Sequence, residues 1–188
     1  MILTSKKLRE IDNNMPAYKK LMYEKRAFDS SEVYDIFISH SYLDKNLINA
    51  LYYIFESCGY TVFIDWKNEE LQNRDEVSKE VAIKLKKYMK NCKGLLYVAT
   101  NNSSNSKWCP WELGFVDGLK NRVAILPILN DEKNEYSGQE YLGIYPYVVY
   151  AKVYKKNDDE FWVHDTEDYN LYSSLKSWLE DGNLKNHN

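Results

Sequence analysis

Residues 33–66 read VYDIFISHSYLDKNLINALYYIFESCGYTVFIDW, and the spacing of their apolar residues changes twice. VYDIFIS (33–39) is a short run of β-branched and aromatic residues, which predicts a buried strand. DKNLINALYYIFESCG (44–59) repeats its apolar residues at the spacing of a helix and ends on a glycine, a common helix stop. TVFIDW (61–66) predicts a second strand. This stretch therefore predicts a strand–helix–strand unit.

The same alternation continues along the chain. Further elements are predicted as a helix over 76–92, a strand over 94–100, a helix over 108–120, a strand over 122–129, a weaker strand near 147–153 and a final helix over about 167–179. Alternating strands and helices imply a parallel sheet with right-handed crossovers and helices on both faces. We therefore expect an α/β fold with a flavodoxin-like, doubly wound, five-stranded parallel sheet.

The first 31 residues differ from the rest. Their apolar residues recur at the spacing of an amphipathic helix, and Pro16 divides that pattern into two short helices. Such helices either pack on their own domain or form a surface for self-association, and the sequence leaves both open. We divide the chain into an N-terminal helical extension (1–31), an α/β domain (32–181) and a C-terminal tail (182–188).

Composition limits the classes of function. Hydrophobic residues make up 44% of the 188 residues and charged residues 28%, a balance typical of a globular domain. The net charge of -3 offers no basic surface for nucleic acid. No apolar run reaches the roughly 18 residues that span a bilayer, and no signal peptide is evident. The cysteines and histidines lack metal-ligand spacing. We expect a cytoplasmic protein without nucleic-acid, membrane or metal partners.

We expect a ligand-binding site in the loops that follow the strands. In open parallel sheets, ligands bind outside the carboxyl ends of the strands. The segment NSKWCPWELGFV (105–116) begins a helix at that edge, and it places Glu112 among bulky apolar residues. A buried, unpaired carboxylate is costly, so Glu112 must reach solvent, have a partner or act in catalysis. The topology predicts that it lies at the open edge of the sheet.

Glu112 and Trp108 are four residues apart and therefore share one face of the predicted helix. An aromatic plane beside a carboxylate can stack a nucleobase or a nicotinamide ring while the carboxylate holds ribose hydroxyls. One carboxylate can also stabilise an oxocarbenium-like transition state at a glycosidic carbon. No second acid is needed when the leaving group already carries positive charge, as nicotinamide does in NAD.

Other interpretations of these residues remain open. A routine first-turn glutamate is favoured by the helix dipole by about 0.3–1 kcal/mol, which would explain Glu112 without chemistry. Cys109 and His40 are expected at the same edge and are a conceivable nucleophile pair. The loop from Ser39 to Ser41 could contact phosphate, although no glycine-rich phosphate loop is present.

Four segments resemble the Toll/interleukin-1 receptor (TIR) domain family. YDIFISHSYLDK (34–45) resembles the first box of that family, and GYTVFID (59–65) resembles its second strand. SKWCPWEL (106–113) followed by VAILPI (123–128) resembles its third helix and fourth strand. The likeness covers roughly residues 33–180, and the order and spacing of the segments are more specific than any one of them.

The resemblance implies an activity and a set of site residues. TIR domains of bacteria, plants and some animal proteins cleave NAD, with a catalytic glutamate four residues after a tryptophan. That position is Glu112 here, with Trp108 shaping the pocket. NAD+ would be the substrate, and no cofactor is implied. The substrate-binding residues implied by position are Ser39, His40, Ser41, Tyr42, Trp66 and Trp108.

The resemblance is greatest to bacterial stand-alone TIR proteins of the Thoeris antiphage type. These convert NAD into a cyclic or modified ADP-ribose that signals to a separate effector, and family members often complete the site between neighbouring protomers. We therefore expect an NAD-consuming enzyme that acts as a homo-oligomer. Two alternatives remain: a non-catalytic assembly module in which Glu112 is structural, and an enzyme similar to nucleoside deoxyribosyltransferases, which share a similar fold and a single glutamate.

Overall fold

A computed structural model describes residues 2–25, 29, 31–64, 78–130, 140–152 and 159–187. Its strands are β1 (Leu3–Thr4), β2 (Tyr34–Ser39), β3 (Val62–Phe63), β4 (Cys92–Ala99), β5 (Val123–Leu129), β6 (Tyr147–Lys152), β7 (Asp159–His164), β8 (Leu171–Ser174) and β9 (Lys185–Asn186). Its helices are α1 (Ser5–Asn14), α2 (Ala17–Lys25), α3 (Lys45–Ser57), α4 (Lys79–Asn91), α5 (Trp108–Lys120) and α6 (Leu175–Asp181). Short 3-10 turns lie at η1 (Tyr42–Asp44), η4 (Ser103–Asn105) and η5 (Glu140–Ile144).

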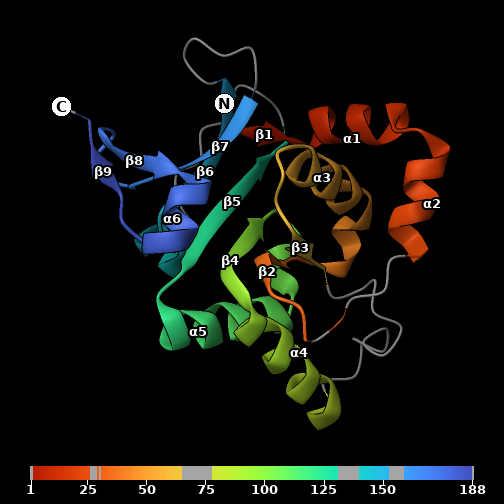
Figure 1. The fold of residues 1–188 in the computed structure, drawn as a ribbon, viewed down its shortest axis with the longest axis horizontal. Helices are drawn as coiled ribbons and strands as arrows, with labels where there is room; N and C mark the ends of the chain where they lie inside the picture. Colours follow the sequence, from red (N-terminus) through yellow and green to blue (C-terminus); the bar gives the residue numbers. More distant parts are fainter. Residues whose placement is uncertain are drawn as a thin grey trace.

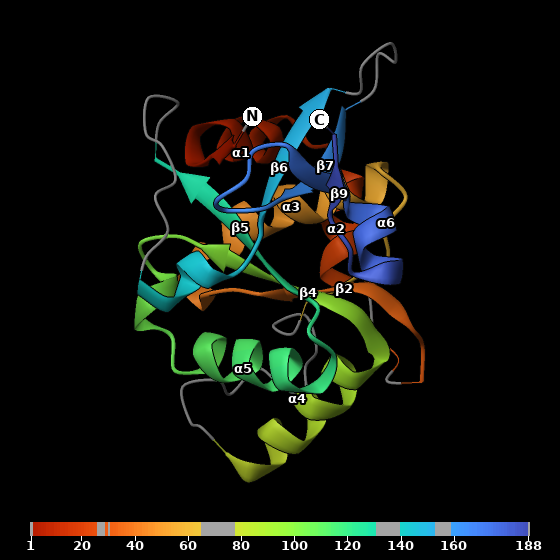
Figure 2. The ribbon, with the colours of Figure 1, turned by 90° about the vertical axis from the view of Figure 1, so that its left-hand side faces the viewer.

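One sheet runs through the molecule, with α1 and α3 on one face and α4 and α5 on the other (Figure 1, Figure 2). Strands β3, β2, β4, β5 and β6 are neighbours in that order and are all parallel. This is the strand order of a flavodoxin-like sheet, so the predicted α/β fold class is confirmed. The parallel strands bring the ends of β2 and β4 to the same edge.

The sheet is larger than the predicted five strands. Strands β7, β8 and β9 continue it beyond β6, each antiparallel to its neighbour. Ring stacking joins these strands: Tyr147 stacks on His164, His164 on Tyr172, and Tyr172 on His187, with centroids 5.7, 5.1 and 3.9 Å apart. Burial lowers the pKa of His164, which keeps its ring neutral within this stack.

The start of the last helix was predicted wrongly. Leu171–Ser174 forms strand β8 instead, and the hydroxyl of Ser174 accepts a hydrogen bond from the backbone N–H of Ser177. A serine in this position caps a helix, so α6 begins only after Ser174. Helix α6 lies so close to β4 that a Cβ atom on Gly94 would stand 2.7 Å from Leu179 Cδ2.

The N-terminal residues form two short helices, as predicted, and both contact the rest of the chain. Helix α1 lies beside α3 (Figure 1) and buries Leu8 completely. In α2, the hydroxyl of Tyr23 donates to Glu56 Oε2 of α3 at 2.6 Å. The sequence did not predict β1, in which Leu3 pairs with Ile128 of β5. The helices therefore pack on their own chain, and a self-association surface stays a prediction.

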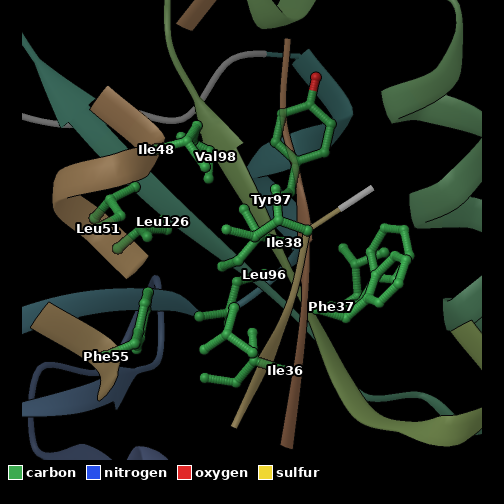
Figure 3. Close-up of a cluster of buried hydrophobic side chains, with 14 of the residues drawn as sticks. Ile36, Phe37, Ile38, Ile48, Leu51, Phe55, Leu96, Tyr97, Val98 and Leu126 are labelled. Carbon is green, nitrogen blue, oxygen red and sulfur yellow. The ribbon is translucent and has the colours of Figure 1, made fainter. Parts of the chain in front are cut away.

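The core between α3 and the sheet shows which way the strand residues face. Figure 3 labels the side chains that α3 and the strands bring together on this side of the sheet, namely Ile36, Ile38, Ile48, Leu51, Phe55, Leu96, Val98 and Leu126. Phe37 and Tyr97 point to the opposite side (Figure 3). Because successive strand residues alternate between faces, Ser39 lies on the same face as Phe37, the face that α5 covers.

Candidate active site

The edge where β2 and β4 end holds the candidate site. Ser39, the last residue of β2, is paired with Tyr97 of β4. The chain leaves β2 toward η1 and leaves β4 toward η4, and α5 begins at Trp108 just beyond η4. The two loops and the first turns of α5 therefore meet at one edge of the sheet.

Glu112 is buried at this edge, with no exposed surface. The hydroxyl of Ser39 donates a 2.6 Å hydrogen bond to Glu112 Oε2. Of the possibilities that the sequence left open, exposure to solvent is excluded and a hydrogen-bond partner is present. A carboxylate can be buried when hydrogen bonds replace water, and a short bond from a hydroxyl to a charged oxygen is among the stronger ones. Ser39 can supply this bond because the pleat of β2 points it toward α5.

A serine before α5 fixes the start of that helix. Ser106 Oγ accepts hydrogen bonds from the backbone N–H groups of Trp108 and Cys109, both at 3.3 Å. These bonds satisfy two donors that would otherwise lack a partner at a helix N-terminus. The predicted helix over 108–120 is confirmed, and Trp108 and Glu112 both lie on its buried side. The Trp108 ring packs edge-on against Trp111, with centroids 5.6 Å apart.

The other predicted site residues follow Ser39 in the chain, and His40 and Ser41 are buried. His40 has no exposed surface, and its Nδ1 lies 3.2 Å from the carbonyl oxygen of Ile38. Ser41 is 6% exposed, whereas Tyr42 in η1 is 58% exposed. Trp66 lies outside the described residues. Tyr42 is therefore exposed at this edge, whereas Ser39, His40 and Ser41 are shielded from solvent.

Sequence reasoning missed a second buried carboxylate at this edge. Asp44, at the end of η1, is 4% exposed. Its Oδ2 accepts a hydrogen bond from the Thr100 hydroxyl at 2.6 Å, and its Oδ1 accepts one from the Asn102 amide at 2.7 Å. The available signal was an aspartate at the first position of a predicted helix, together with a run of serine, threonine and asparagine after the third predicted strand.

Local hydrogen bonds hold the run of serine, threonine and asparagine after β4 in a tight turn. The Thr100 hydroxyl accepts hydrogen bonds from the backbone N–H groups of Asn102 and Ser103, at 3.1 and 3.2 Å. Ser103 Oγ donates in turn to the Thr100 carbonyl oxygen at 2.9 Å. Short hydroxyl side chains commonly stabilise tight turns through such local bonds. The path from β4 to α5 is therefore fixed.

Comparison with known proteins identifies the family. Residues 36–180 match the TIR domain family, from within β2 to within α6. This chain belongs to the TIR domain family. A protein of Bacillus cereus (strain MSX-D12) named "Probable 3' cyclic ADP-D-ribose synthase ThsB'" is 40% identical over 168 residues, which cover 89% of this chain and 86% of that protein.

Two further similar proteins match a smaller part of this chain. A protein of Cytobacillus dafuensis, named "Putative cyclic ADP-D-ribose synthase TIR2", is 28% identical over 113 residues, which cover 60% of this chain and 30% of that protein. The crystal structure of the TIR domain of the Toll-related receptor TRR-2 from Hydra magnipapillata is 21% identical, with a TM-score of 0.40, covering 56% of this chain and 77% of that one.

Within this TIR domain, the Ser39 hydroxyl is a neutral donor to Glu112. Burial raises the pKa of Tyr97 to about 12, so its hydroxyl stays protonated at neutral pH and lies 3.4 Å from the Ser103 carbonyl oxygen.

Among the residues that the structure describes, no three acidic, histidine or cysteine side chains are grouped to hold a metal ion. In the same residues, no helix is both long and apolar enough to cross a membrane.

Proposed function

We propose that this TIR domain is an enzyme that cleaves the nicotinamide–ribose bond of NAD+ and makes a cyclic or modified ADP-ribose. The observation that carries the proposal is the buried Glu112 carboxylate, held by the Ser39 hydroxyl at the ligand-binding edge of the sheet. The names of two relatives support it, since both are described as cyclic ADP-D-ribose synthases of probable or putative standing. The ThsB' relative covers most of both chains.

The proposed chemistry needs one carboxylate. The bond between ribose C1′ and the nicotinamide nitrogen breaks, and its electron pair neutralises the positive charge of the nicotinamide ring. Positive charge then builds on the ribose, and Glu112 stabilises it at short range. Ser39 holds the carboxylate in place, so little reorganisation is needed as the charge develops. Trp108, on the same face of α5, shapes the side of the pocket next to the ribose.

The second step determines the product. An oxygen nucleophile attacks C1′ and loses its proton, and this nucleophile is a hydroxyl of the same ADP-ribose, another small molecule or water. If the open form closes again around the substrate, the exclusion of water favours an internal hydroxyl over hydrolysis. We therefore favour a cyclic product, which would act as a messenger to a separate effector in antiphage defence.

Access to this site requires a change in the protein. Because Glu112, Trp108 and His40 are each less than 10% exposed, NAD+ cannot reach the carboxylate without movement of its neighbours. We propose that copies of the chain assemble into a homo-oligomer, and that assembly stabilises the open form. The single protomer described here would then be the resting state.

The deciding experiment is incubation of the purified protein with NAD+, at low and high protein concentration, with and without lysate from phage-infected cells. Mass spectrometry should detect nicotinamide and a nucleotide equal in mass to ADP-ribose less one water. Glu112→Gln should release no nicotinamide while keeping the unfolding temperature of the wild type. Equal turnover by purified Glu112→Gln would refute the role of Glu112, and free ADP-ribose alone would refute cyclisation.

A non-catalytic assembly module is the second candidate, because a fully buried and hydrogen-bonded carboxylate would also suit a structural role. Under that hypothesis, Glu112→Gln would lower stability, and no nicotinamide would be released even by the oligomer. Adding deoxynucleosides to the same assay tests the remaining alternative, since a deoxyribosyltransferase would release a free base and leave NAD+ intact.

A further inference from the structure

Asp44 occupies the N-cap position of α3, yet its carboxylate does not cap that helix. An aspartate in this position ordinarily accepts a hydrogen bond from a backbone N–H in the first turn, and losing such a cap costs about 1 kcal/mol. The carboxylate instead accepts from Thr100 and Asn102 in the loop after β4. Their bonds, at 2.6 and 2.7 Å, are in the range of charge-assisted hydrogen bonds.

Two separate contacts consequently join a first segment, residues 39–44 from the end of β2 through η1, to a second segment, residues 100–112 from the end of β4 into α5. Ser39, at the start of the first segment, contacts Glu112 in α5. Asp44, at its end, contacts Thr100 and Asn102 before α5. A second contact at a distance from the first restricts the relative rotation that a single contact would allow.

We propose that Asp44 is a positioning residue for NAD+ cleavage, which holds the segment after β2 against the segment that leads into α5. This inference rests on the proposed function. Asp44 does not touch the substrate; it acts through Thr100 and Asn102 on the turn that precedes Ser106 and α5. A misplacement of about 1 Å at a reacting group can cost about 100-fold in rate, so a contact of this kind has a measurable effect on catalysis.

The chain offers a matched control in Asp35, near the other end of β2. Asp35 Oδ2 accepts hydrogen bonds from the backbone N–H and the hydroxyl of Thr61, both at 2.9 Å. Its Oδ1 lies 2.7 Å from Lys93 Nζ at the start of β4. Like Asp44, this carboxylate joins β2 to neighbouring segments through a threonine and one further donor. It lies at the amino ends of the strands, at the opposite edge from Glu112.

The test compares Asp44→Ala, Asp44→Asn and Asp35→Ala in the full chain, under the conditions in which the wild type releases nicotinamide. Asp44→Ala removes both contacts, and we expect kcat to fall about 10- to 100-fold with KM changed less than kcat. Asp44→Asn keeps an acceptor for Asn102, so its kcat should lie between those of Asp44→Ala and the wild type. Asp35→Ala should keep kcat within about twofold of the wild type while losing stability.

Hydrogen exchange measured by mass spectrometry gives a readout that does not depend on NAD+. Backbone amides in residues 100–106 should exchange faster in Asp44→Ala than in the wild type, and at the wild-type rate in Asp35→Ala. If Asp44→Ala does not fold, Asn102→Ala removes the bond to Asp44 Oδ1 and leaves both the carboxylate and the Thr100 hydroxyl in place. That variant should show the same loss of kcat and the same faster exchange.

The outcomes separate this inference from the proposed function. If the wild type cleaves NAD+ and Asp44→Ala matches Asp35→Ala in both kcat and exchange, the inference is overturned and the proposed function stands. If the wild type does not cleave NAD+ under any condition, the proposed function is overturned, and the exchange of residues 100–106 then decides whether Asp44 positions this segment.

Discussion

The hydroxyl of Ser39 and the carboxylate of Glu112 lie 2.6 Å apart although 73 positions separate them in the chain. Their bond joins the last residue of β2 to the second turn of α5. It gives the buried carboxylate a partner, and it defines where its charge would sit relative to a bound ribose.

Replacing Ser39 by alanine should therefore weaken catalysis. A buried acceptor that loses its donor costs about 1–3 kcal/mol, so nicotinamide release should fall by roughly 10-fold or more. Ser39→Thr keeps the hydroxyl and should retain most of the activity. Steady-state kinetics of nicotinamide release, together with thermal unfolding of each variant, measure both effects. Equal activity of the alanine and threonine variants would contradict this role of Ser39.

Ser106→Ala should destabilise α5 and disturb the site that it carries. Loss of a serine cap costs about 1 kcal/mol, which corresponds to a drop of about 2–4 °C in Tm for a chain of this size. Ser174 is the matched control, since its hydroxyl caps α6 in the same way. We expect Ser174→Ala to lose similar stability without loss of nicotinamide release. A parallel loss of activity in both variants would show that stability alone explains the effect.

The free energy of unfolding should depend on pH through the Asp35 carboxyl. Burial alone would raise the pKa of Asp35, but hydrogen bonds from Lys93 and Thr61 outweigh it and hold the pKa below its ordinary value of 3.8. A lowered pKa in the folded state means that the charged form stabilises the fold above about pH 4. That contribution is lost as the pH falls through the folded-state pKa.

Asp35→Asn should accordingly lower the free energy of unfolding at pH 7, by no more than about 1 kcal/mol because Asp35 and Lys93 are partly exposed. The difference between the variant and the wild type should shrink toward zero below about pH 3. Urea unfolding at pH 7, 5 and 3 measures it. A difference that stays constant over this range would mean that the charge of Asp35 contributes nothing.

Tyr23→Phe should loosen α2 and leave catalysis unchanged. The Tyr23 side chain is 3% exposed, and its hydroxyl contributes the 2.6 Å bond to Glu56. Burial and the neighbouring Glu56 both raise the pKa of Tyr23, so this hydroxyl remains a donor. We expect a loss of about 0.5–1.5 kcal/mol in stability and faster amide exchange in α2. Unchanged exchange would show that apolar contacts alone hold α2 on α3.

The sequence allowed prediction of those features that depend on local spacing. The change in apolar period over 33–66 predicts β2, α3 and β3, and the separation of Trp108 from Glu112 predicts that they share one face of α5. The parallel strand order follows from the alternation of strands and helices. The roles assigned to the site residues remain predictions that only the variants above can test.

Features that depend on distant partners could not be predicted. The burial of Glu112 depends on Ser39, and the direction of the Asp44 carboxylate depends on Thr100 and Asn102. No local pattern indicates such pairs. The segment Leu171–Ser174 was predicted as part of a helix because its leucine continues a helical spacing. In the structure this segment is a strand because it pairs with β7, and its own residues do not indicate that pairing.

Strand β1 has a consequence for the order in which the chain folds. Leu3 and Thr4 leave the ribosome well before Ile128 and Leu129, the residues with which they pair. Helix α1 can pack on α3 early, but the strand that precedes α1 has no partner until β5 is complete. Contacts so distant in sequence form slowly and leave nascent chains prone to aggregation. Synthesis that pauses before residue 129 should therefore yield chains that need a chaperone.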